Sequence, residues 1–177
     1  MQRQTRVGKE TFAAVLGWLR GVPVANRLMV LVLAVAYLLP MAAVDYRSGS
    51  LATHACSVVS HANIFHLMAN AYCILLFRWT PRWLLAFAVA FAATFIPAPV
   101  WSWSELGFVT APTCGASGMI LAAMADGFAR AGKWKELVKY VVIPILPLTI
   151  VPNINTPIHL YCIIIAYTYT TITKRMR

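Results

Sequence analysis

Long apolar segments, separated by short clusters of charged or turn-forming residues, dominate this sequence. Uncharged stretches cover residues 28–44, 48–77, 83–104, 106–125 and 140–173. A helix needs about 20 residues to cross a bilayer. The last stretch is long enough for two short helices, with a turn at residues 152–157, where prolines and asparagines gather. The pattern therefore predicts six spans, at residues 27–44, 61–78, 82–98, 115–131, 136–151 and 157–173.

The composition of the chain favours the same fold class. Hydrophobic residues make up 60% of the 177 positions, and charged residues make up only 11%. A soluble domain of this size cannot bury that much apolar surface. We therefore expect an all-α, polytopic membrane protein built as a bundle of six transmembrane helices.

The net charge of +10 is explained by the distribution of the basic residues. Every Lys and Arg except Arg47 lies before the first predicted span, after the last one, or near the turns that join spans two to three and four to five. Basic residues concentrate on the cytoplasmic side of membrane proteins. Both termini are therefore expected in the cytoplasm, and no nucleic-acid partner is needed to explain the charge.

We expect one domain with two short flanking segments. Residues 1–26 form a cytoplasmic segment, in which the apolar side chains of residues 9–19 lie near one helical face, as in a short interfacial helix. Residues 27–173 form the six-helix core, and residues 174–177 form a basic cytoplasmic tail. The absence of a targeting segment favours the plasma (inner) membrane of a prokaryote, with an organelle membrane as the alternative.

Polar residues in the second predicted span mark a candidate site. His66 and Asn70 are four residues apart and therefore lie on one face of a helix. Strongly polar residues inside a membrane usually face a bundle interior or a water-filled cavity. Hydrogen bonding between helices explains the pair equally well. His61, near the membrane boundary, fits either a functional or a purely interfacial position.

A serine between glycines, in Gly115-Ala-Ser117-Gly118, opens the fourth predicted span. Close helix contacts use the same residue types, but the arrangement also suits an exposed nucleophile beside the N–H groups of a helix start. His159 stands at the corresponding depth of the sixth span, two residues after Pro157. Because Ser117 and His159 stand at matching depths, the fourth and sixth predicted spans are candidates for a shared site.

Small residues below Ser117 and His159 predict that the two spans pack closely. They recur at helical spacing in both spans, as Gly118, Ala122, Ala125 and Ala129 in one and as Cys162, Ala166 and Thr170 in the other. Such stripes permit close approach of helices. A contact along them would bring Ser117 within hydrogen-bonding reach of His159, as a nucleophile and its general base. A contact with no chemical role is the alternative.

Other intramembrane chemistries fit the sequence less well. Asp126 is the only acidic residue in the interior of a predicted span, so a site with paired carboxylates is unsupported. His61 and His66 are five residues apart with no carboxylate nearby, unlike the ligands of an HExxH zinc site. The four cysteines show no CxxC spacing. We therefore expect no metal, no cofactor and no disulfide. A metal or haem binder that uses His61, His66 and His159 is the rival hypothesis.

Taken together, His61-x4-His66-x3-Asn70, Gly-Ala-Ser117-Gly and His159 resemble the rhomboid family of intramembrane serine proteases. The resemblance covers roughly residues 27–173. It implies that Ser117 is the nucleophile and His159 the general base. It also implies that His66, Asn70 and the backbone N–H of Ser117 stabilise the oxyanion. Supporting roles fall to His61, Gly115 and Gly118.

The resemblance also implies a class of substrate and partner. The expected substrate is a single-span membrane protein, cleaved in or beside its transmembrane helix at a small residue, within the lipid bilayer. A catalytically inactive rhomboid-like protein that binds transmembrane clients is the alternative. The sequence gives no indication of an oligomeric state.

Three features depart from the family pattern. The first outer loop, residues 45–60, is short and contains Arg47 but no tryptophan, which implies altered substrate gating. Cys162 and Ala166 stand where the family usually has glycines, which implies a slightly wider contact between the spans. Leu121 stands where an aromatic residue often packs on the base histidine, which implies a less firmly oriented base.

Overall fold

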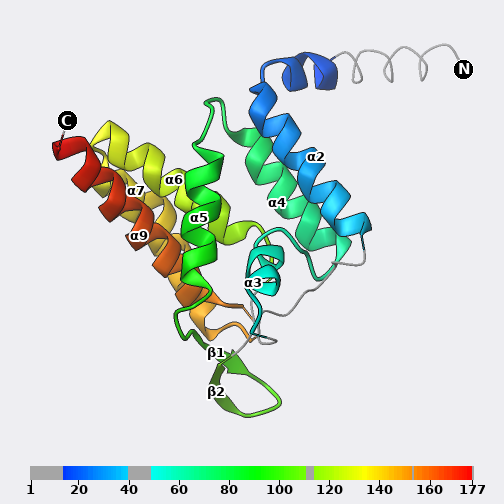
Figure 1. The fold of residues 1–177 in the computed structure, drawn as a ribbon, viewed down its shortest axis with the longest axis vertical. Coiled ribbons are helices and arrows are strands. Elements are labelled where there is room, and N and C mark those ends of the chain that lie inside the picture. Colours follow the sequence, from blue (N-terminus) through cyan, green and yellow to red (C-terminus); the bar gives the residue numbers. More distant parts are fainter. Residues whose placement is uncertain (1–13, 40–48, 111–113, 153, 177) are drawn as a thin grey trace, which may run out of the picture.

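The computed structural model describes residues 14–39, 49–110, 114–152 and 154–176, and in these residues the chain is mostly helical (Figure 1). Helix Ala14–Arg20 comes first. The α-helices that follow are α2 (Val24–Leu38), α3 (Leu51–Ser57), α4 (Ile64–Leu76), α5 (Trp83–Ala93), α6 (Ser117–Ala131), α7 (Trp134–Leu137), α8 (Ile143–Ile145) and α9 (Thr156–Arg175). The remaining elements are the π-helix η2 (Val138–Val142), the 3₁₀-helix η3 (Leu146–Ile150) and the strands β1 (Pro99–Ser102) and β2 (Gly107–Thr110).

Each of the six predicted spans contains helical structure, although the bounds differ. The helix of the first predicted span, α2, begins at Val24 rather than at residue 27, because Pro23 supplies a fixed φ at the helix start. Within the described residues, no single helix meets the length and hydropathy expected of a membrane span. Helix Ala14–Arg20 and α2 meet these criteria only together, and they are bent by 106°. The start of the predicted interfacial helix, residues 9–13, lies outside the described residues.

The prediction of an all-α fold is wrong for residues 99–110. The helix α5 ends at Ala93, and Pro97 and Pro99 cannot continue a helical ladder of hydrogen bonds. The chain instead forms an antiparallel hairpin of β1 and β2, in which Trp101 pairs with Phe108. These residues lie between the predicted spans 82–98 and 115–131, and their aromatic and β-branched side chains favour strands.

A second element that the sequence did not predict is α3, which lies in the segment expected to be a loop. Ser50 caps it, since the Ser50 Oγ accepts the Thr53 N–H at 3.1 Å. Midway along α3, the ring Nδ1 of His54 lies 2.7 Å from the Thr94 hydroxyl, just after α5. A capped start and a side-chain contact to a neighbouring helix therefore hold this short helix in place.

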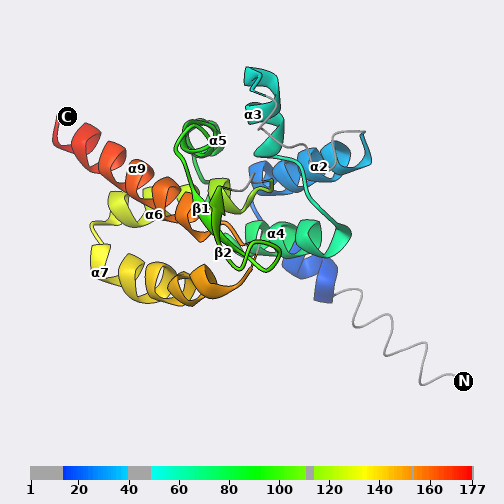
Figure 2. The same ribbon diagram turned by 90° about the horizontal axis from the view of Figure 1, so that it is seen from below.

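The helices are arranged around α6, which packs against α9, α5 and α4 (Figures 1 and 2). The helix α2 covers the other side of α4. At one end of this pair, the buried side chain of Asn26 donates to the carbonyls of Phe77 and Trp79, both at 3.0 Å, and accepts from the Trp83 indole at 3.1 Å. Asn26 thereby joins α2 to the turn between α4 and α5.

The fifth predicted span is a continuous but irregular helical run from Trp134 to Ile150. It passes from α7 through η2 and α8 into η3. Pro144 and Pro147 lack the N–H that a regular α-helix requires, so the hydrogen-bond pattern must change around them. The start of this run, α7, packs against α6, and its end, η3, packs against α9; the run lies on the side of α6 away from α5 (Figure 2).

Candidate active site

The site is built around a hydrogen bond between the first residue of α6 and the fourth residue of α9. The Ser117 Oγ lies 2.8 Å from the His159 Nε2. Both side chains are half-buried. Within the described part of the chain, His159 makes no hydrogen bond to a carboxylate. The arrangement is a serine paired with a histidine that has no acidic third member.

The close contact between α6 and α9 brings this pair together. Gly118 faces Cys162, and a Cβ added to Gly118 would lie 3.1 Å from the Cys162 Sγ. Ala122, Ala125 and Ala166 are completely buried along the same contact. The two stripes of small residues therefore meet, and their small side chains let the helix axes approach.

The start of α9 is held by capping interactions. The Asn155 side chain accepts the Ile158 N–H at 3.2 Å, and Pro157 occupies the first turn, where its missing N–H costs nothing. These two features fix the turn that carries His159. The sequence treated residues 152–157 only as a turn, and the Asn-Thr-Pro pattern was the signal of this cap.

A tight turn at Gly115 leads into Ser117. Gly115 has a φ of +125°, and its N–H donates to the Ser57 carbonyl at 2.8 Å. A Cβ at this position would lie 2.5 Å from the His66 Cε1. The turn therefore needs a glycine for two reasons, its backbone conformation and the imidazole packed against it. The bond to Ser57 also makes α3 a support of the site.

The helix α4 supplies the second half of the site. Asn63 caps it by accepting the His66 N–H at 2.9 Å. One turn further, the Asn70 Nδ2 lies 3.0 Å from the Nε2 of the fully buried His61. The rings of His61 and His66 meet edge to face with their centroids 5.1 Å apart. His61 therefore lies behind Asn70 and His66 and touches both.

An open cavity of about 560 Å³ joins the two halves. Four of the predicted site residues, His66, Asn70, Ser117 and His159, line it. The remaining lining residues are Ala62, Ala69, Cys114, Leu148, Ile154 and Asn155. His61 is not among the lining residues, but it contacts Asn70 and His66, which are. Sequence reasoning missed Asn155 and Leu148, because both come from segments read as a turn or as an ordinary span.

A second polar cluster lies near the other ends of α6 and α9. Asp126 is 2% exposed, and its Oδ1 accepts the Thr170 hydroxyl at 2.7 Å. Arg82 contacts both carboxylate oxygens and also donates to Thr170 at 3.0 Å. The Arg130 Nε lies 3.2 Å from the Asp126 Oδ2. No partner of Asp126 was predicted from the sequence, and Arg82 was assigned to the basic turn between the second and third predicted spans.

Of the residues that depart from the family pattern, Cys162 and Leu121 lie within the described part of the chain. Cys162 is buried against Gly118, and Leu121 is half-buried beside the core. Arg47 lies outside the described residues. No disulfide joins the four cysteines, and the described residues hold no group of three His, Cys, Asp or Glu side chains arranged to bind a metal ion.

A comparison with known protein families finds a match over most of the described elements. The profile of the rhomboid domain matches residues 48–172, from the segment before α3 to the last turns of α9. Searches of curated proteins and of solved structures each returned no match. The family match covers more than half of the chain and includes every residue that lines the cavity. The chain therefore belongs to the rhomboid family.

Proposed function

We propose that this protein is an intramembrane serine protease in which Ser117 and His159 form the catalytic dyad. The observation that carries the proposal is the hydrogen bond of 2.8 Å between the Ser117 Oγ and the His159 Nε2 at the wall of an open cavity. A serine activated by a histidine is a sufficient nucleophile for acyl transfer. Membership of the rhomboid family supports the assignment of these two residues as nucleophile and general base.

In the first step, the His159 Nε2 takes the proton of the Ser117 hydroxyl while the Oγ attacks the carbonyl carbon of the scissile peptide bond. The carbonyl electrons move to its oxygen, and a tetrahedral oxyanion results. As this intermediate collapses, the C–N bond breaks and His159 passes the proton to the leaving amine. Ser117 is left as an ester of the new carboxyl end.

In the second step, water from the cavity hydrolyses that ester. His159 takes a proton from the water as the water oxygen attacks the ester carbon, and a second tetrahedral oxyanion results. As it collapses, the bond between this carbon and the Ser117 Oγ breaks, His159 returns the proton to the Oγ, and the released carboxylic acid loses its remaining proton to water. The products are a free carboxylate and the original dyad. The cavity lies open beside Ser117, as this step requires.

The oxyanion is stabilised by donors on α4 and at the start of α6. The Asn70 amide has two N–H groups, so its contact with His61 leaves one for the oxyanion. His66 lines the same cavity, packed against the Gly115 turn. The Ser117 N–H belongs to the first turn of α6, where backbone N–H groups have no partner within the helix. Donors fixed in this way stabilise a developing negative charge without having to reorganise.

Membership of the rhomboid family implies an integral membrane protein. We further propose that the six helical segments cross the bilayer with both chain ends on the cytoplasmic side. The first described helix and the C-terminal end of α9 lie at one end of the bundle, and the hairpin lies at the other (Figure 1). This arrangement supports a cavity that opens on the outer side.

The proposed substrate is a single-span membrane protein with a locally weakened helix. A peptide carbonyl within a regular helix is hydrogen-bonded and cannot enter the site in extended form. Glycine and proline lower the stability of a helix and free such carbonyls. The resemblance to rhomboid proteases further implies a small residue at the cleaved bond.

Labelling with a fluorescent fluorophosphonate tests the proposal directly. The wild-type protein is expected to become labelled, and Ser117→Ala and His159→Ala are expected to remain unlabelled. Ser104→Ala, an exposed serine of the hairpin, is the matched control and should label like the wild type. The measurement is made in detergent and repeated in lipid vesicles. A folded wild type that stays unlabelled in both would favour the inactive client-binding protein instead.

A further inference from the structure

We propose that the β1–β2 hairpin anchors the protein in the interfacial layer of the lipid bilayer. The proposed contact surface consists of Trp101, Trp103 and Phe108, with Leu106 at the turn. Its partner is the phospholipid headgroup and upper acyl-chain region on the side of the bilayer where the cavity opens. The inference rests on membership of a membrane-protein family and not on catalysis by Ser117.

The hairpin has two chemically different faces. Side chains alternate between the faces of a strand, and along β1 Val100 and Ser102 are only 2% and 6% exposed. Trp101 points to the opposite face, where it stands directly across from Phe108. One face is therefore packed on the protein, and the other carries the aromatic side chains.

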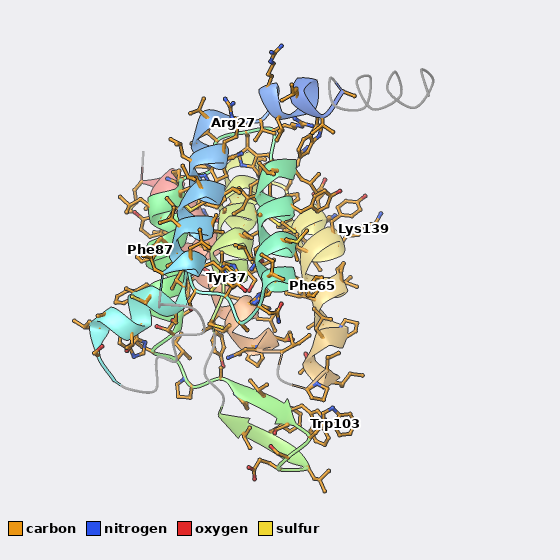
Figure 3. All side chains as sticks on the ribbon, turned by 90° about the vertical axis from the view of Figure 1, so that its right-hand side faces the viewer. Arg27, Tyr37, Phe65, Phe87, Trp103 and Lys139 are labelled. Carbon is orange, nitrogen blue, oxygen red and sulfur yellow. The ribbon has the colours of Figure 1, made fainter. Side chains whose placement is uncertain are left out.

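The aromatic face is highly exposed. Trp103 is 67% exposed, Phe108 61% and Leu106 77%. The Trp101 ring contacts the rings of Phe108 and Trp103, with centroid separations of 5.6 and 6.4 Å. Figure 3 shows Trp103 at the hairpin end of the molecule, with Arg27 near the opposite end. Three connected aromatic rings thus lie on this face, with Trp103 and Phe108 exposed and Trp101 half-buried.

The chemistry of this face fits the membrane interface better than the hydrocarbon core. A two-stranded hairpin has outer edges with unpaired N–H and C=O groups, and such edges are not tolerated in hydrocarbon. Glu105 and Ser104 are exposed at the turn. Tryptophan is enriched at the headgroup level, because its ring is apolar while its N–H seeks a polar partner. A polar turn beside exposed tryptophans matches that layer.

The hairpin contacts the elements that form the cavity wall, so an anchor at the hairpin also positions the site. The strand β1 packs against α9 and η3, the elements that carry His159 and Leu148 of the cavity wall. In addition, the Tyr161 hydroxyl on α9 donates to the Pro97 carbonyl, just before β1, at 3.1 Å. A hairpin held at the headgroup level therefore sets the depth of the cavity mouth relative to the bilayer surface.

The depth of position 103 tests the proposal in the full-length protein. A cysteine-free background carrying Trp103→Cys is labelled with an environment-sensitive fluorophore and placed in phosphatidylcholine vesicles. Quenching is measured with iodide and with lipids that carry a nitroxide near the headgroup or deep in the chain. Lys135→Cys, exposed at α7, serves as the aqueous reference, and Ile164→Cys, exposed in mid-α9, as the deep reference.

We expect the shallow nitroxide to quench position 103 about twofold more strongly than the deep one, with little quenching by iodide. Iodide quenching equal to that at position 135, without lipid quenching, would overturn the proposal. Energy transfer between labels on two copies of the chain would overturn it in favour of a protein contact. Helical content and a single gel-filtration peak verify that each labelled protein is folded.

A second experiment replaces two of the aromatic side chains while the fluorophore stays at one position in the hairpin. With the label on Leu106→Cys, adding Trp101→Ser and Phe108→Ser should raise iodide quenching about twofold, because the turn leaves the interface. Leu51→Ser, an exposed apolar residue of α3, is the matched control and should change nothing. An unchanged signal in the doubly substituted hairpin would contradict the anchor.

Discussion

The two ends of the α6–α9 contact use polar side chains in opposite ways. At one end, Ser117 and His159 share a hydrogen bond and face an open cavity. At the other end, Asp126 is buried, and Thr170, Arg82 and Arg130 surround it. The first pair has room for a further reactant, whereas the second cluster has its hydrogen-bonding capacity filled by the protein.

This difference teaches that one helix contact can serve for chemistry at one end and for stability at the other. A buried carboxylate is tolerated only when it is paired and hydrogen-bonded. Asp126 meets that condition, because donors reach both of its oxygens. A nucleophile needs the opposite condition, a partner for its proton and open space for its substrate. The comparison predicts that substitutions at the two ends affect different measurements.

The largest expected effect is on activity at the cavity end. Ser117→Ala or His159→Ala should lower the cleavage rate of a transmembrane substrate by about 10⁴- to 10⁶-fold, because the nucleophile or its base is lost. The free energy of unfolding in detergent should change by no more than about 0.5 to 1.5 kcal/mol, the value of one hydrogen bond. Substantial cleavage by either variant would show that another residue is the nucleophile or base.

The next effect concerns the oxyanion donors on α4. His66→Ala and Asn70→Ala should each lower the cleavage rate by about 10²- to 10³-fold. Fluorophosphonate labelling should continue at a reduced rate, because Ser117 and His159 remain paired. Rates are measured on purified variants with one substrate, and Tyr72→Ala, exposed on the same helix, is the control. A loss as large as that of Ser117→Ala would mean that these residues act on the dyad itself.

At the buried end, the expected effect is on stability. Asp126→Ala leaves Arg82 and Thr170 without their acceptor and should lower the free energy of unfolding by roughly 2 to 3 kcal/mol. The value is at the low end for a broken buried pair because the Arg82 side chain is 41% exposed and can reach solvent. Chemical unfolding in detergent measures it, with Glu136→Ala as control. A variant as stable as the wild type but unlabelled by fluorophosphonate would contradict the division of roles.

The smallest expected effect lies between the two ends. A Cβ at Gly118 would lie 3.1 Å from the Cys162 Sγ, so Gly118→Ala should push the helices apart by a few tenths of an ångström. We expect the labelling rate of Ser117 to fall about two- to fivefold. The double variant with Cys162→Ala should recover most of the rate, because the bulky partner is gone. Additive losses in the double variant would show that the two residues do not share this contact.

The parts of the site that follow from local spacing were accessible to sequence reasoning. His66 and Asn70 are one turn apart, so any regular helix places them on one face. The small residues below Ser117 and His159 recur at helical spacing, so two regular helices that pack along them bring Ser117 close to His159. The cluster around Asp126 could not be predicted, because Arg82 lies 44 residues away along the chain. Its charge was also already explained as one of the basic residues on the cytoplasmic side of the membrane. A pairing of that kind depends on how three helices pack.

In the fold, too, features that depend on local sequence were predicted, and features that depend on contacts between segments were not. The apolar stretches predicted where helices lie, since their length and periodicity are local properties. They did not predict α3 or the hairpin, because both lie in segments between the predicted spans and are too short to show a clear periodicity. The structure shows what forms them, the Ser50 cap at the start of α3 and the cross-strand pairing of Trp101 with Phe108.

The two constraints on Gly115 also decide how reversibly this protein can change over generations. A methyl group at position 115 would overlap the His66 ring, and a φ of +125° is strained for any residue with a side chain. Replacing His66 by a smaller residue removes only the first of these constraints. Glycine is therefore retained at position 115 in a lineage that loses His66, and a single reversion at position 66 can still restore the contact.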